Sequence, residues 1–162
     1  MKKFVLLTIV LVLLVFSGLN AYAADNPVVG MRNKIFEEAK QIKSSLAETK
    51  DIVLVNSMWD SCIMTVSQLD AYFSLVGIFN TIKKDNITES AINYLVDWLK
   101  QIKMTAELNI KSLDAITNPL EAKTKTQMDI LKRNFSDLNT RIGTELGKHS
   151  ILLRSLKVKE KK

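Results

Sequence analysis

Residues 128–156 read MDILKRNFSDLNTRIGTELGKHSILLRSL. Two rows of mostly apolar side chains run through this stretch at seven- to eight-residue spacing: Met128, Phe135, Ile142, His149 and Leu156 in one row, and Leu131, Leu138, Leu146 and Leu153 in the other. Such rows form one face of a long helix that packs against other helices. The stretch therefore predicts a helix belonging to a bundle.

Three earlier segments repeat this spacing, and we predict helices over residues 27–48, 51–84, 87–117 and 119–156. Asn26-Pro27 and Asn118-Pro119 each place a capping Asn before a Pro at the first helical position, and Asn86 stands three residues before Glu89. Short connections make neighbouring helices antiparallel. We therefore expect an all-α fold: an antiparallel up-down four-helix bundle over residues 24–156, after an N-terminal signal peptide.

The boundary between the first two helices carries neither Gly nor Pro. An unbroken helix from 27 to 84 would span about 87 Å at 1.5 Å per residue, far longer than its neighbours. We therefore place a turn near 48–51, with Asp51 capping the second helix. The expected core is aliphatic with four aromatic residues and one cysteine: Trp59, Phe73, Trp98, Phe135 and Cys62.

The first 23 residues have the layout of a secretory signal. Lys2 and Lys3 precede an apolar run, and Ala21-Tyr22-Ala23 supplies small residues at the −3 and −1 positions of a cleavage site. The apolar run is shorter than the roughly 20 residues of a spanning helix. We expect cleavage after Ala23 and a periplasmic or secreted protein.

The net positive charge of the chain is concentrated at the C-terminus. Without the signal segment, residues 24–153 carry 16 charges of each sign, while residues 154–162 carry five basic residues and one acid. A neutral body behind an export signal disfavours nucleic-acid binding. The basic tail, residues 157–162, allows contact with an anionic membrane surface or an acidic partner, or is simply a solvated helix end.

The composition excludes several kinds of chemistry. One Cys and one His rule out an intrachain disulfide, a Cys-rich zinc site and a single-chain site with two His ligands. The sequence has no Gly-rich phosphate loop, and the closest approach to a di-iron motif is the pair Glu145 and His149, which is typical of an intrahelical contact. We therefore expect a non-enzymatic protein with no metal and no cofactor.

Met31 and His149 occupy the relative positions that hold the haem in periplasmic haem-b four-helix cytochromes, and the chain resembles these proteins at those two residues. The resemblance implies a haem or small-ligand carrier. The rise per residue of the predicted helices argues against a shared haem, because it puts the two side chains about 20 Å apart along the bundle.

The predicted helix lengths suggest an interaction surface. The first helix stops short of the end where the second is apolar on all sides, over residues 71–79. One face there would lack a cover and form an apolar groove, unless neighbouring segments close it. Its expected partner-binding residues are Leu75, Ile78, Phe79, Ile82, Ile142, Leu146 and His149.

These patterns favour a function in protein–protein interaction or self-association, with a protein partner or homo-oligomer, through an apolar helix surface. The alternatives are a membrane-associated bundle, held by its apolar end and basic tail, and the small-ligand or haem-b carrier.

Overall fold

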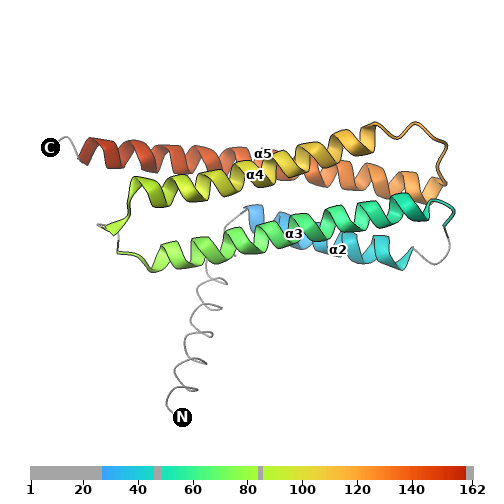
Figure 1. Cartoon of the computed structure of the whole chain (residues 1–162), viewed down its shortest axis with the longest axis horizontal. Coiled ribbons are helices and arrows are strands. Elements are labelled where there is room, and N and C mark those ends of the chain that lie inside the picture. Colours follow the sequence, from blue (N-terminus) through green and yellow to red (C-terminus); the bar gives the residue numbers. More distant parts are fainter. Residues whose placement is uncertain (1–26, 46–48, 84–85, 160–162) are drawn as a thin grey trace, which may run out of the picture.

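The computed structural model describes residues 27–45, 49–83 and 86–159, which form four helices and, within those ranges, no strand (Figure 1). The helices are α2 (Pro27–Ser44), α3 (Ile52–Thr81), α4 (Glu89–Asp114) and α5 (Ala122–Lys159). The predicted four-helix bundle is confirmed. The expected signal peptide and residues 160–162 of the basic tail lie outside the described residues.

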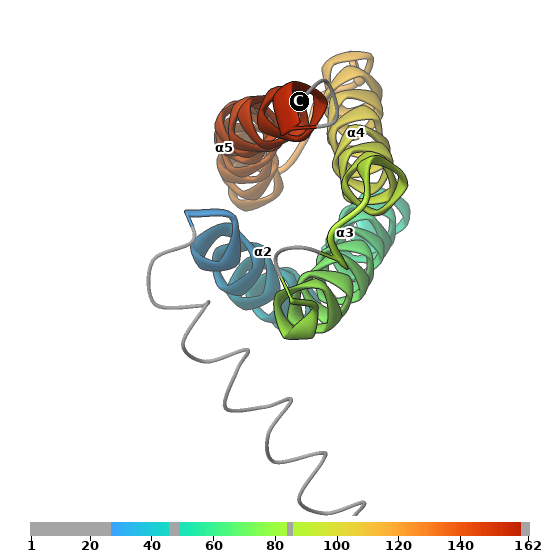
Figure 2. The ribbon, with the colours of Figure 1, turned by 90° about the vertical axis from the view of Figure 1, so that its left-hand side faces the viewer.

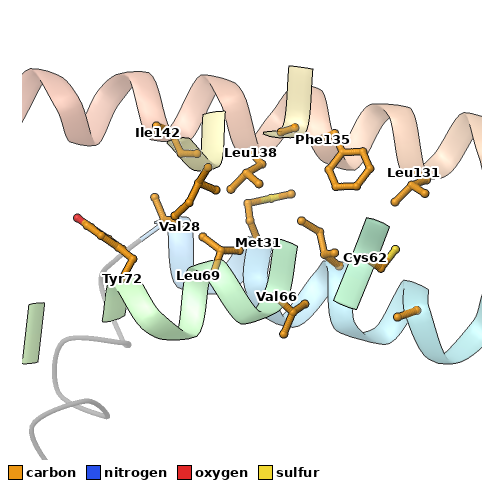
Figure 3. Close-up of a cluster of buried hydrophobic side chains, with 14 of the residues drawn as sticks. Val28, Met31, Cys62, Val66, Leu69, Tyr72, Leu131, Phe135, Leu138 and Ile142 are labelled. Carbon is orange, nitrogen blue, oxygen red and sulfur yellow. The ribbon is translucent and has the colours of Figure 1, made fainter. Parts of the chain in front are cut away.

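The helices run alternately up and down and enclose one core. Figure 2 shows them around a ring, in which α2 packs on α3 and α5, and α4 packs on α3 and α5. Along the axis of this ring lie the largest fully buried side chains, including Phe135, Leu138, Leu131, Leu69 and Met31 (Figure 3). The fold thus buries most of the two rows from which it was predicted, and Leu146, Leu153 and Leu156 are half-buried.

The edges of the core differ from expectation. Trp59 and Trp98 are half-buried and pack against the core from its margin, and the Lys43 ammonium lies 5.4 Å from the Trp59 ring. An amphipathic indole can keep its apolar body on the core and its polar edge near water. Cys62 is fully buried, as expected, and burial raises the pKa of its thiol to about 12.

Three helices begin later than predicted, and the cap of α4 comes from a different residue. Thr88, rather than Asn86, caps α4: its hydroxyl accepts a hydrogen bond from the Ala91 amide at 3.2 Å. Asp51 precedes α3 but makes no capping bond with its side chain. Its carboxylate instead accepts a hydrogen bond from the Glu121 amide at 2.9 Å.

That contact belongs to a cluster that joins the α2–α3 connection to the start of α5. The Glu121 carboxylate accepts hydrogen bonds from the Thr49 hydroxyl at 3.0 Å and the Lys50 amide at 3.2 Å. Residue 121 is thereby held outside the helix, and α5 begins at Ala122 instead of residue 119. The cluster fixes the end of the bundle at which α2 stops and α3 begins.

At the opposite end the bundle has three described helices. The Arg141 guanidinium donates a hydrogen bond to the Pro27 carbonyl at 3.3 Å, so α2 begins level with Arg141. α5 continues to Lys159, about 27 Å further at 1.5 Å per residue. Lys157 forms an ion pair with Glu89 at 3.1 Å, which ties the start of the basic tail to the start of α4. We call this end of the bundle the far end.

Candidate functional site

The groove expected at the far end does not form from the seven predicted residues. Ile142 is fully buried and lies beside Val28 of α2 (Figure 3), and His149 is 8% exposed. Leu146 packs against the core. These three α5 residues face the bundle interior because they continue the two rows that contain Phe135 and Leu138, so their proposed place on an exposed surface is wrong.

The four predicted residues on α3 lie on a different face. Leu75 and Phe79 are partly buried against the core, Ile82 is half-buried and Ile78 is 60% exposed. Leu75, Phe79 and Ile82 follow Gln68 at helical spacing, and the Gln68 amide bonds to Thr105 of α4 at 3.2 Å. This set of residues therefore borders α4 and does not face the space beyond the start of α2.

His149 has a structural role in the far end. Its Nε2 atom lies 3.2 Å from the Tyr72 hydroxyl, which joins α5 to α3 through a buried hydrogen bond. Burial lowers the pKa of His149, the nearby Glu145 carboxylate opposes that shift, and Lys148 adds to it. Glu145 is also buried and pairs with Lys148 at 2.9 Å.

These positions do not fit a haem held by Met31 and His149. The Pro27–Arg141 and Lys34–Asp137 contacts fix the alignment of α2 and α5, and they leave the two candidate ligands roughly 14–18 Å apart along the bundle. Axial ligands of one haem must lie within a few ångströms of each other. Among the described residues, no group of three or more His, Cys, Asp or Glu side chains is placed to hold a metal ion.

Glu38 is a buried carboxyl that sequence reasoning did not find. It lies on α2 with 6% of its surface exposed, and its Oε1 atom has no hydrogen-bond partner. Burial raises the pKa of Glu38, while Lys34 partly opposes the shift. The Glu38 charge in turn adds to the raised pKa of Cys62. A sequence signal for this residue does exist: residue 38 follows Met31 by seven and precedes Ile42 by four, so it falls in the apolar row of α2.

Exposed apolar side chains gather instead on α3 and α4. Eight large apolar residues of the described chain are between 45% and 81% exposed, and seven of them belong to these two helices: Ile52, Val53, Met64, Ile78, Tyr94, Met104 and Leu108. The eighth, Ile151, lies on α5. Two adjacent helices thus carry nearly all the exposed apolar side chains.

Helix α3 is unusual in another respect. By length and composition alone it could cross a membrane, a test that a core helix of a soluble bundle also passes. In its most apolar stretch 39% of the residues are buried in the bundle, and the others are half-buried or exposed. The segment 51–82 contains no Lys or Arg.

Five exposed residues and the half-buried Ala71, beside the α3–α4 contact, form what we call the outer face: Met64, Ala71 and Ile78 on α3, and Tyr94, Gln101 and Leu108 on α4. None of the six carries a charge at neutral pH. Between them lie Leu75 and Trp98, which are half-buried, so apolar atoms continue along the contact. Ile78 is the one member that sequence reasoning included.

A sequence signal for the other members does exist. Residues 64, 71 and 78 are spaced by seven, as are residues 94, 101 and 108, in addition to the rows that form the core. Helix α3 therefore carries apolar side chains at two sets of seven-residue positions. The prediction considered a single apolar row per helix and therefore missed the second row of α3.

No protein-family model, curated protein or solved structure matches this chain.

Proposed function

We propose that this protein is an exported, non-enzymatic helical bundle that binds protein through the outer face of α3 and α4. The observation that carries the proposal is the concentration of exposed large apolar side chains on these two adjacent helices. Contiguous exposed apolar surface usually marks an interaction site. Met, Tyr and other aromatic residues are also enriched at protein interfaces, where charged side chains are depleted.

The charges around α3 favour a protein partner over a membrane surface. Helices that lie on membranes usually carry Lys and Arg beside their apolar face. Helix α3 has none, and its two acids are Asp60, which is exposed, and Asp70, which pairs with Arg32 at 2.9 Å. The basic residues near the end of α5 lie on a different helix. His149 and Ile142 pack inside the far end, which leaves less apolar surface there for contact with a membrane.

The proposal that the protein is exported rests on residues 1–23, whose charged start, apolar run and small residues follow the signal-peptide layout. Intact mass measurement of the protein from its producing cell tests this part. A chain beginning at Ala24 is expected, and a full-length chain would contradict it.

Site-specific photo-crosslinking tests the interaction itself. A benzoyl-phenylalanine is placed at Leu108 of the full chain in the producing cell, with the same substitution at Ile151 as the control. Both side chains are exposed, at 54% and 68%, but only Leu108 belongs to the outer face. Protein adducts are expected from position 108 and not from position 151. The absence of any protein adduct at 108, or recovery only of lipid adducts, would overturn the proposal.

A further inference from the structure

The order of large and small residues along the outer face indicates which kind of protein can bind it. On α3 its residues are Met64, Ala71 and Ile78, and on α4 they are Tyr94, Gln101 and Leu108. Seven-residue spacing keeps side chains on one face of packed helices, as in a coiled coil. On each helix a smaller or polar residue stands between two large ones.

The hydrogen bond between Gln68 and Thr105 aligns the two helices and fixes the height of each residue. At 1.5 Å per residue, Met64 and Leu108 lie together about 5 Å to one side of that bond. Ile78 and Tyr94 lie together about 16 Å to the other side. Two large apolar pairs therefore stand at the ends of the outer face.

Ala71 and Gln101 lie midway between those pairs, at the same height to within about 2 Å. The outer face therefore presents a large apolar pair, then a small residue beside an amide, then a second large apolar pair. This order is the same when it is followed in either direction along the bundle.

We propose that the outer face binds the outer face of a second copy of this chain, across a two-fold axis that lies in the interface at right angles to the helices and runs through Ala71 and Gln101. The inference rests on the proposed function and names its partner. In the dimer α3 packs antiparallel on α3 of the second copy, and α4 packs on α4. Each Met64 then lies against Ile78 of the second copy, and each Tyr94 against Leu108.

Two-fold symmetry suits the residues at the centre. A closed dimer requires a surface that complements itself, so a residue on the axis meets its own copy. Ala71 is small enough to let two helices approach closely. The Gln101 side chain has both donors and an acceptor, so two such amides can satisfy each other across the axis.

The charges at the border of the outer face agree with this arrangement. Asp60 precedes Ala71 by eleven residues, and Lys83 follows it by twelve; both are exposed. An antiparallel pair centred on Ala71 brings Asp60 of each copy beside the C-terminal end of α3 of the other copy, where Lys83 follows the helix, so opposite charges approach each other at both edges. Complementary charge at the border of an interface favours one orientation over others.

A disulfide placed on the axis tests the geometry. The full chain with Ala71→Cys is incubated with oxidised glutathione, and covalent dimer is measured by non-reducing electrophoresis. Ala71 is half-buried at the surface, so the fold should tolerate the change, and circular dichroism verifies it. The native Cys62 is fully buried with a pKa raised to about 12, so it contributes little background.

Ser136→Cys is the control, since Ser136 is exposed on α5 away from the outer face. Covalent dimer is expected to form roughly ten-fold or more faster from Ala71→Cys than from Ser136→Cys, because dimerisation raises the effective concentration of the paired thiols. A mixture of Met64→Cys and Ile78→Cys chains should also cross-link faster than either variant alone.

Equal cross-linking of Ala71→Cys and Ser136→Cys would overturn the inference. The result also separates it from the proposed function. If Leu108 photo-crosslinks to a different protein while Ala71→Cys stays monomeric, self-association is wrong and protein binding through the outer face remains. If Leu108 yields no protein adduct and Ala71→Cys stays monomeric, both are wrong.

Discussion

Replacement of Glu38 by methionine is expected to stabilise the bundle. The Glu38 side chain is 6% exposed, and its Oε1 atom lacks a hydrogen-bond partner. An unsatisfied buried polar atom costs about 1–3 kcal/mol, and Met has nearly the same length and helix propensity as Glu. Glu38→Met should therefore raise the free energy of unfolding by about 1–3 kcal/mol at neutral pH.

The stability gained by Glu38→Met should increase with pH. Burial raises the pKa of Glu38 above its value in the unfolded chain. The folded protein then holds the proton more tightly, so this group lowers stability as pH rises from about 4.3 through the raised folded pKa. The methionine variant lacks that loss, and its advantage over wild type should be larger at pH 7.5 than at pH 4.

Urea unfolding followed by circular dichroism at both pH values measures the effect. For a chain of this size the melting temperature should rise by roughly 2–4 °C per kcal/mol. Glu37→Met is the matched control, since Glu37 is exposed, pairs with Lys40 on the surface and should change stability by less than about 0.5 kcal/mol. A Glu38→Met variant less stable than wild type, or one with the same pH dependence, would refute the reasoning and imply that Glu38 is satisfied when ionised.

Three other substitutions probe the fold. Phe135→Ala empties a fully buried site and should lower the free energy of unfolding by about 3–5 kcal/mol in urea titrations; a loss below about 1 kcal/mol would contradict its central place in the core. Because burial lowers the pKa of His149, the unfolded chain binds its proton more tightly, so His149 should reduce stability as pH falls below about 6.5. Unfolding of His149→Gln at pH 5 and 7.5 should lack that part of the decline, and an unchanged decline would refute it. Thr88→Ala removes the α4 cap and should cost about 1 kcal/mol, whereas Asn86→Ala should cost little; equal losses would contradict the assigned cap.

Most of the fold could be predicted because apolar spacing determines which side of each helix is buried. The two rows that contain Phe135 and Leu138 lie largely in the core, and α2 stops at Ser44, near the turn that helix lengths required. Helix starts were harder to place, because a capping group is chosen by tertiary contacts. Asp51 had the composition of a cap, but its carboxylate bonds to the Glu121 amide in a distant part of the chain.

The candidate site was harder to predict because it depends on how neighbouring helices turn relative to each other. The short α2 was expected from the sequence, and three helices do form the far end of the described bundle. It did not follow that Ile142 and His149 were exposed, since both continue the core row of α5. The outer face is defined by which residues of α3 border α4, and the sequence of neither helix alone determines that pairing.

Sedimentation velocity of the full chain tests the central claim, self-association through the outer face, most directly. Wild type is compared with Leu108→Glu and with Ile151→Glu, which places the same charge at another exposed apolar residue, on α5. Wild type and Ile151→Glu should show a dimer that dissociates on dilution, while Leu108→Glu should remain a folded monomer. A wild-type chain that is monomeric at every concentration, or a Leu108→Glu chain that dimerises like wild type, would contradict it.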